Sequence, residues 1–247
     1  QEQMNINLQN IASENNQQIL ITTHSPIFVC RNTLALSSII RVQKRKGQTN
    51  IFQIKNSEIN TLFDDNLSLF KLFSDLLNDS GTSEEIKKKI NKKNLGNASP
   101  DLALKLEEET IKYFLWLDSE RAALFFAKHI VICEGASEKI FIDYLMNNQW
   151  HDLKEKHIYF LDAMGKYSIH GFMNLFGKLG ITHSVLMDSD NDKDIHKYIN
   201  DFINDNKTDF TWHIDSFETD LEAFLGIDKP ARADLKPLNI MMKHKQN

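Results

Sequence analysis

The chain has 247 residues, and its hydrophobic content of 41% and its 16 phenylalanines exclude a disordered protein and suit one large domain or two smaller ones. The net charge of −5 at pH 7 does not favour a nucleic-acid partner, because lysine and arginine are needed to neutralise phosphates. The acidic and basic residues are clustered, however, so the net charge alone excludes no class of function.

The sequence has no feature of a membrane or secreted protein. No apolar run approaches the ~20 residues that cross a bilayer, and the polar start of the chain does not resemble a secretion signal. Cys30 and Cys133 lie in or beside apolar, strand-like runs, and they lack the spacing of a zinc site. Two buried free thiols fit a reducing cytosol, so we predict a cytoplasmic protein without a membrane partner.

The first part of the chain contains three predicted strands. Residues 18–22 read as a short buried strand, because three apolar residues follow one another. Residues 39–43 and 50–54 are two further strands, and Lys46-Gly47 between them predicts a hairpin turn. The basic run at 41–46 either follows a phosphate backbone or forms a solvated loop.

A helical pattern covers residues 58–128. Apolar side chains recur at helical spacing over residues 69–77, and the polar residues 78–81 predict the end of that helix. Residues 94–100 are the best candidate for a linker. Residues 102–126 read as one or two apolar helices, which either cover the protein's own sheet or pack against another subunit.

The last 120 or so residues alternate between strand and helix, which predicts an α/β fold with a mainly parallel sheet covered by helices. Sites in such sheets form beyond the carboxyl ends of the strands. The predicted strands are residues 129–133, 157–161, 184–187 and 210–214.

Four carboxylates follow two of these strands. Glu134 ends the first strand, and Glu138 is four residues further along the helix that begins there. Asp188 and Asp190 end the third strand, and they would point to the same side if the segment is extended. Carboxylates so close repel and raise one another's pKa unless a cation binds, and oxygen ligands indicate Mg²⁺ or Mn²⁺.

The acidic run after the third strand has two other interpretations. Asp-rich runs are often solvated turns. A calcium loop is the other, but Lys193 and Ile199 stand where such a loop has glycine and glutamate. The Glu-Gly and Asp-rich elements at the ends of two strands of one α/β unit together favour the metal site.

Two sequence elements resemble a TOPRIM domain, the metal-binding fold of topoisomerases, bacterial primases and certain nucleases. They are HIVICEGASEKIFIDYL (129–145) and SVLMDSDND (184–192). Within that superfamily the chain is similar to the OLD (overcoming lysogenisation defect) nucleases, in which an ABC-type ATPase precedes the TOPRIM domain. ILITTHSPIF (19–28) resembles the carboxyl-terminal half of that ATPase, with His24 as its switch histidine, and ERAALFFAKHIVICEG resembles the junction before the TOPRIM strand.

The resemblance implies three segments and a function. The segments are an ATPase fragment (1–57), a helical, possibly dimerisation, segment (58–128) and a TOPRIM nuclease domain (129–247). It implies that Glu134, Glu138, Asp188, Asp190 and Glu222 hold two metal ions, that Glu134 and Lys236 are catalytic, and that DNA is cut. Glu218 is a rival to Glu222, and a helix-start carboxylate and a solvated surface lysine are the ordinary interpretations of Glu222 and Lys236.

The phosphate-binding loop GxxxxGK[ST] of an ATPase does not occur in the sequence, so we expect no ATP hydrolysis from this chain alone. His24 would contact ATP only in a protein that supplies the other half of the ATPase; otherwise it lies in a turn before Pro26. By resemblance, we expect a bacterial anti-phage role, a homodimer or larger assembly, and possible protein or RNA partners of a defence system. The alternatives are a non-enzymatic, metal-stabilised nucleic-acid-binding or assembly module and another TOPRIM enzyme.

Overall fold

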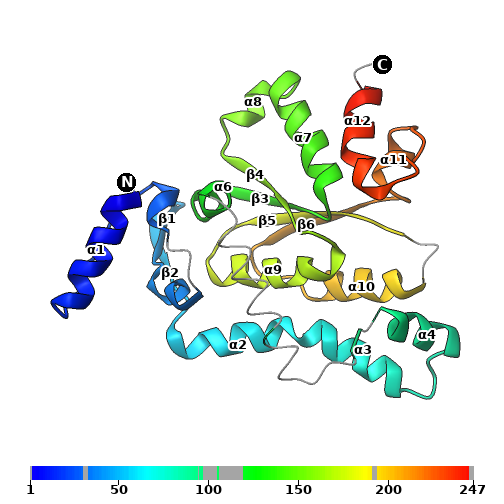
Figure 1. The fold of residues 1–247 in the computed structure, drawn as a ribbon, viewed down its shortest axis with the longest axis horizontal. Helices are drawn as coiled ribbons and strands as arrows, with labels where there is room; N and C mark the ends of the chain where they lie inside the picture. The colour runs from blue at the N-terminus through cyan, green and yellow to red at the C-terminus, as the bar shows by residue number, and fades with distance from the viewer. Residues whose placement is uncertain are drawn as a thin grey trace.

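Four strands of the second half of the chain form one parallel sheet in the computed structural model, which describes residues 2–29, 33–93, 95–96, 105, 119–190 and 194–244. In the spatial order β4-β3-β5-β6 they are β4 (Ile158–Asp162), β3 (His129–Cys133), β5 (His183–Asp188) and β6 (Thr211–Phe217) (Figure 1). All four predicted strands and their parallel arrangement are confirmed. A helix follows each of the first three strands, as parallel neighbours require.

Helices cover both faces of this sheet (Figure 1). One face carries α7 (Ala136–Asn148), against which α12 (Lys236–His244) packs, and the opposite face carries α9 (Ile169–Lys178) and α10 (Asp194–Asp205). Successive residues of β3 point to opposite faces: Ile130 and Ile132 join the core on the α9 side, and Cys133 packs with Ile142 of α7. The short elements are α8 (His151–Lys154), η4 (Lys166–Ser168), α11 (Leu221–Phe224) and η5 (Ala233–Leu235).

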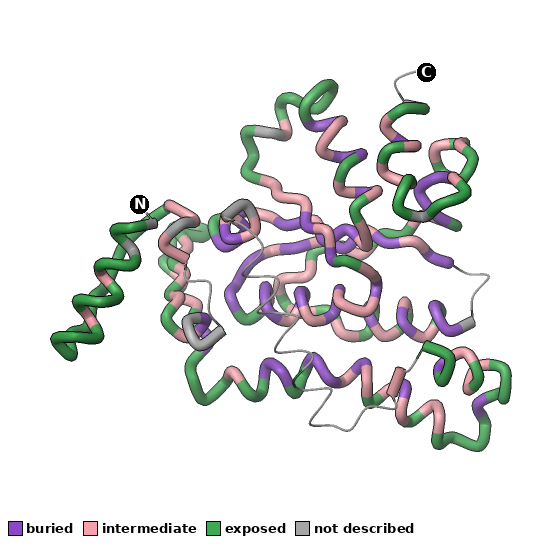
Figure 2. The backbone as a smooth tube through the Cα atoms, viewed as in Figure 1, coloured by how far each residue is buried: buried purple, intermediate pink, exposed green. Residues whose placement is uncertain are grey.

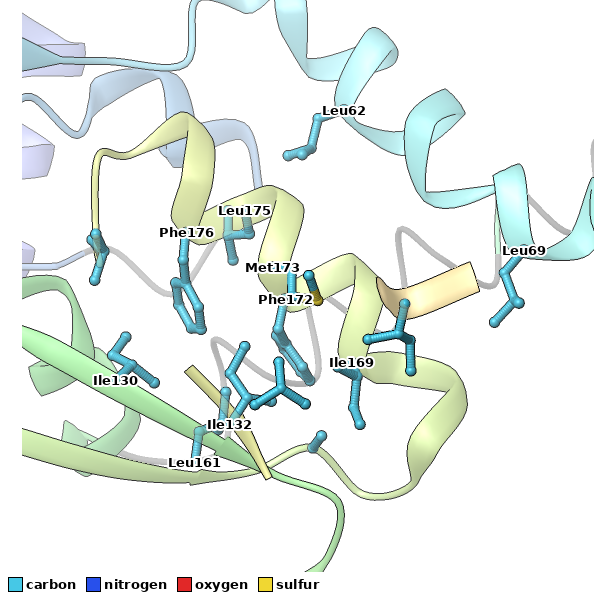
Figure 3. Close-up of a cluster of buried hydrophobic side chains, with 14 of the residues drawn as sticks. Leu62, Leu69, Ile130, Ile132, Leu161, Ile169, Phe172, Met173, Leu175 and Phe176 are labelled. Carbon is cyan, nitrogen blue, oxygen red and sulfur yellow. The ribbon is translucent and has the colours of Figure 1, made fainter. Parts of the chain in front are cut away.

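The main core lies between the sheet and α9, where large apolar side chains from the strands meet those of the helix (Figure 3). Phe172 and Phe176, one helical turn apart on α9, are stacked with their ring centroids 6.2 Å apart. This burial anchors the sheet from which the acidic residues project.

A second helical layer packs beneath α9 and α10 (Figure 1). It consists of α2 (Asn56–Asn66), α3 (Ser68–Asn78) and α4 (Glu84–Lys92), so the predicted helix end at residues 78–81 is confirmed. Leu62 and Phe73 of this layer belong to the same core as Ile130 and Phe172, so the layer covers the helices of its own sheet. A role in dimerisation stays a prediction.

The segment that leads into β3 contains α6 (Ser119–Ala122) and η3 (Ala123–Phe126). The predicted linker at 94–100 falls mostly outside the described residues, and so does most of the predicted helix at 102–126.

The predicted strand at residues 18–22 is wrong. This stretch has no regular secondary structure, and Leu20 is 83% exposed. A buried strand needs a hydrogen-bonded neighbour, and none of the described strands pairs with it. It connects α1 (Glu2–Glu14), which is exposed along its length (Figure 2), to the short turns η1 (Pro26–Phe28) and η2 (Thr33–Ser38).

The predicted hairpin is confirmed as β1 (Arg41–Arg45) and β2 (Gln48–Phe52). Lys46 and Gly47 both have positive φ angles, 49° and 82°, which suit the two-residue turn of a twisted hairpin.

Arg41 joins this hairpin to the domain of the parallel sheet. Its guanidinium group donates hydrogen bonds to the carbonyl oxygens of Phe125 and Ala127, just before β3, and of Leu179 and Gly180, between α9 and β5, at 2.9–3.3 Å. Burial lowers the pKa of Arg41. The planar, five-donor guanidinium suits such a set of carbonyls better than an ammonium group would.

Among the described residues, no helix has both the length and the apolar character needed to cross a membrane. Cys133 is buried and free, and burial raises the pKa of its thiol, so it is a packing residue and not a reactive nucleophile. Cys30 lies outside the described residues.

Candidate metal centre

The acidic residues gather where the chain reverses its direction through the sheet. After β3 the chain crosses to β4 on one side, and it then returns past β3 to form β5 and β6 on the other side. A crevice forms beyond the carboxyl ends of two such neighbouring strands. Glu134 directly follows β3, and Asp188 is the last residue of β5.

Glu134 bridges these two strand ends. Its Oε2 atom accepts a hydrogen bond from the backbone N–H of Asp188 at 3.0 Å, and its carbonyl oxygen accepts one from Gly165 N after β4 at 2.8 Å. The sequence prediction that Glu134 and Asp188 come together is therefore confirmed.

Glu138 lies in the first turn of α7 and is buried. Its Oε2 accepts a hydrogen bond from Gly135 N at 2.9 Å, so the carboxylate caps the start of the helix. Burial, together with the negative charges of Glu134 and Glu222, raises its pKa to about 7. Glu138 thus has a structural role and also belongs to the acidic group.

Asp188 has a carboxylate oxygen that is available to a ligand. Its Oδ1 atom is buried and has no hydrogen-bond partner in the described part of the chain. Burial, followed by the negative charges of Glu138, Glu134, Asp190 and Asp220, raises its pKa to about 7. A buried oxygen without a partner is costly, so this atom is available to a ligand.

Asp190 differs from the sequence prediction. The strand ends at Asp188, and Asp190 has a φ angle of 48°, so the segment is not extended. Its Oδ2 lies 3.0 Å from Nδ1 of His196 on α10 and 3.4 Å from Nζ of Lys166. Asp190 still lies close enough to Asp188 to raise its pKa. The residues from 191 to 193 are outside the described part of the chain.

Lys166, in the turn after β4, is a member of this site that the sequence does not single out. It is only 2% exposed, although lysine is rarely buried without a partner. Its Nζ donates a hydrogen bond to the Asp188 carbonyl oxygen and lies 3.6 Å from Glu134 Oε2 as well as near Asp190. The signal in the sequence is the pair Gly165-Lys166 after a strand, where Gly165 has a φ angle of 121°.

Glu222 and Lys236 form an ion pair on the same side of the sheet as Glu138. Glu222 is 1% exposed, and its Oε1 lies 3.1 Å from Lys236 Nζ. Its charge is one cause of the raised pKa of Glu138, so it belongs to the acidic group. Glu218, the rival residue, is exposed. Asp220 beside them is buried, caps α11 through Ala223 N, and pairs with Lys229.

The donor set fits a divalent cation, although within the described ranges no three His, Cys, Asp or Glu side chains are already gathered as a ligand group. The donors are all oxygens, as Mg²⁺ and Mn²⁺ prefer. The free Oδ1 of Asp188 and the raised pKa values of Asp188 and Glu138 both indicate negative charge that is not fully balanced. Lys166 supplies part of the positive charge in this arrangement.

Residues 125–190 match the family model described as Overcoming lysogenization defect protein-like, TOPRIM domain. This part of the chain has a TOPRIM-like fold. Among curated proteins, no match to the chain was found. The TOPRIM-like fold supports a metal-dependent enzyme that acts on nucleic acid at a coarse level, as nucleases, primases and topoisomerases do.

The match to the TOPRIM family model includes Glu134, Glu138, Asp188 and Asp190, and it ends before Glu222 and Lys236. It also begins after the segment that resembles an ATPase, so that likeness stays a prediction. His24 is exposed in the irregular segment before η1, whose N-cap is Ser25. Its predicted contact with ATP is therefore not tested.

The metal-free protein should lose stability as the pH rises from ~4 to about 7. Asp188 has a pKa of about 7 when folded and ~4 when unfolded, so the folded state holds this proton more tightly and is favoured at low pH. In EDTA, Asp188→Asn should be more stable than the wild type at pH 8, because it removes the buried negative charge. The expected difference in the free energy of unfolding is only ~1–2 kcal/mol, since solvent screens a half-buried carboxylate.

Urea unfolding at about pH 3.5 and at pH 8 measures this difference. Near pH 3.5 the wild-type carboxyl is largely protonated in both the folded and the unfolded state, so the two proteins should have nearly the same free energy of unfolding. An equal difference at both pH values would show that Asp188 is not electrostatically strained.

Proposed function

We propose that the chain is a divalent-metal-dependent endonuclease that cleaves DNA phosphodiester bonds. The observation that supports this best is the free, buried Oδ1 of Asp188 within a group of carboxylates at the switch point of a TOPRIM-like sheet. A cation bound at this position would offset the cost of burying this oxygen among other negative charges.

In this proposal Glu134, Asp188 and Asp190 hold one ion, and Glu138 and Glu222 contribute to a second. The ions, Mg²⁺ or Mn²⁺, would supply an activated water and neutralise the leaving oxygen. Alternatively, Glu134 would act as the general base, which takes up a proton at a carboxylate oxygen. The Lys236 ammonium stabilises the negative charge that develops on the phosphate. Before the substrate binds, the ion pair with Glu222 holds this ammonium group in place.

Plasmid nicking tests the proposal. The purified chain is incubated with supercoiled DNA in Mg²⁺, Mn²⁺ or EDTA, and we expect nicked circles only with a metal. Single-stranded DNA, duplex DNA and RNA are tested as well, because the proposal names DNA as the first substrate but does not specify its strandedness. No cleavage of any substrate, with a folded protein, would overturn it.

Glu222→Gln should lower the cleavage rate by at least ~10- to 100-fold, because the loss of a group that only supports a metal ligand already costs that much. Glutamine keeps the size of this buried side chain but removes its charge. The matched control is Glu218→Gln, four residues earlier and exposed, which should cleave like the wild type. Equal rates for the two variants, measured at saturating Mg²⁺, would remove Glu222 from the site.

The second candidate is a non-enzymatic nucleic-acid-binding or assembly module. One observation favours it: three lysines pair with the acidic residues of this site, Lys166 with Glu134 and Asp190, Lys236 with Glu222, and Lys229 with Asp220. Such pairs stabilise a structural acidic cluster. In that case DNA binding would persist in EDTA without any cleavage when Mg²⁺ or Mn²⁺ is added.

The wider context belongs to the same proposal. By resemblance to the OLD nucleases, an ATPase region would control cleavage, with ATP bound in the full-length protein and His24 near it. A homodimer or larger assembly, a role in anti-phage defence, and protein or RNA partners also rest on that resemblance. Size-exclusion chromatography with light scattering tests the assembly directly.

A further inference from the structure

A pocket of about 430 Å³ opens at the opposite end of the sheet from the carboxylates. Its lining residues stand where β3, β5 and β6 begin and at the end of β1 in the hairpin. Its lining includes Arg45, Lys128, His129, Asp209, Phe210 and Trp212. Neither the carboxylate site nor the predicted ATP contact makes use of this pocket.

Trp212 gives the pocket an open aromatic surface. Its side chain is 78% exposed, although a tryptophan usually buries most of its surface. Its indole meets the ring of His129 edge to face, with centroids 5.4 Å apart, and His129 Nε2 lies 3.0 Å from Ser184 Oγ. The indole is thus supported from one side, and its flat surface is free to stack on a planar ligand.

Two cations stand beside this aromatic surface. Arg45 is exposed at the end of β1, in the basic run that the sequence marks as a possible phosphate contact, and Lys128 is exposed just before β3. In the described part of the chain, no ion pair or hydrogen bond engages the side chain of either residue, whereas Asp190 and Glu222 have cationic partners. Asp209 also lines the pocket, so its carboxylate disfavours a phosphate on that side.

Arg45 is held in position by the rest of the hairpin. Arg41, four residues earlier on the same strand, is bonded to carbonyl oxygens that precede β3 and β5, the strands that border the pocket. The distance between the hairpin and the strand ends is therefore fixed. A strand whose backbone is held in this position brings the Arg45 side chain beside the aromatic surface at a lower cost in entropy when a ligand binds.

We propose that this pocket binds an unpaired nucleotide of a single-stranded nucleic acid. The base stacks on Trp212, and Arg45 and Lys128 bind the neighbouring phosphates. A base inside a duplex has both faces covered, so the pocket selects single strands. Strands of five to seven residues separate the pocket from the carboxylates by ~20 Å. The pocket thus serves as an anchor for the substrate of the proposed nuclease, on which this inference rests.

Fluorescence anisotropy of a labelled single-stranded oligothymidylate, measured in EDTA so that no cleavage occurs, tests the pocket. Trp212→Ala should weaken binding by ~5- to 150-fold, which is the usual value of one stacked base, and Trp212→Phe should keep most of the affinity. Trp150→Ala is the matched control, because Trp150 is also exposed but lies next to α8. The double variant Arg45→Ala/Lys128→Ala should reduce the slope of log affinity against log salt by ~1.4.

Three results would overturn the proposed binding of single strands in this pocket. They are no binding by the wild type, equal affinity of folded Trp212→Ala and wild type, or a duplex that binds as tightly and loses as much affinity in Trp212→Ala. Thermal melting confirms that the exposed substitution leaves the fold intact. Binding that depends on Trp212, without cleavage in any metal, would support the binding pocket and contradict the proposed nuclease activity. Cleavage without such binding would support the nuclease activity and contradict the binding pocket.

Discussion

Asp188→Asn should lower metal-dependent cleavage by more than ~100-fold while leaving the protein folded. Loss of a group that only supports a metal ligand already costs ~10- to 100-fold, so loss of the ligand itself should cost more. Asparagine keeps the shape of the side chain but replaces one carboxylate oxygen and removes the charge, and the Oδ1 of Asp188 has no hydrogen-bond partner among the described residues that would be lost. The measurement is the initial rate of plasmid nicking in Mg²⁺ and in Mn²⁺, with circular dichroism to confirm the fold.

Asp152→Asn is the control for this variant. Asp152 is an exposed aspartate on α8, a short helix that follows α7. Its substitution should leave the nicking rate unchanged. A folded Asp188→Asn protein that nicks DNA as fast as this control would contradict the metal site at the end of β5.

Lys166→Met should destabilise the metal-free protein by roughly 3 kcal/mol at pH 8, because it leaves Glu134 and Asp190 without their buried counter-ion. For a chain of this size that is a fall in Tm of about 6–12 °C. A bound divalent cation would replace the lost charge, so Mg²⁺ should restore much of the stability. Thermal melting in EDTA and in excess Mg²⁺ measures both effects.

Lys178→Met on α9 provides the comparison, because Lys178 makes an exposed ion pair with Asp65 at 3.8 Å. Exposed pairs contribute little, so its Tm should stay within a degree or two of the wild type in both buffers. An equal fall for Lys166→Met with and without Mg²⁺ would mean that Lys166 only fills space in the core.

The sequence predicts the α/β unit well because each of its strands carries its own apolar run and lies next to a helix of clear periodicity. The hairpin is also predictable, since Lys46-Gly47 suits a turn with two positive φ angles. Residues 18–22 have the same apolar character, but none of the strands in the described ranges lies beside them, and sequence pattern cannot supply a neighbour.

Part of the site is equally predictable. Glu134 and Asp188 follow strands, so the topology alone brings them together. The cations are harder to predict, because Lys166 reaches the site from a turn and His196 from a helix. The left-handed conformation of Asp190 is also unforeseen, since aspartate adopts it only where surrounding contacts hold it.

The hydrogen bonds of Arg41 have a mechanical consequence. One guanidinium group holds the turn before β5 and the segment before β3; Glu134 directly follows β3, and Asp188 is the last residue of β5. A displacement of the hairpin would therefore pull on both strands at once, and strands are stiff along their length. The hairpin is in this sense coupled to the two acidic strands, and Arg41 is one of the side chains through which a displacement of the first fifty residues would reach them.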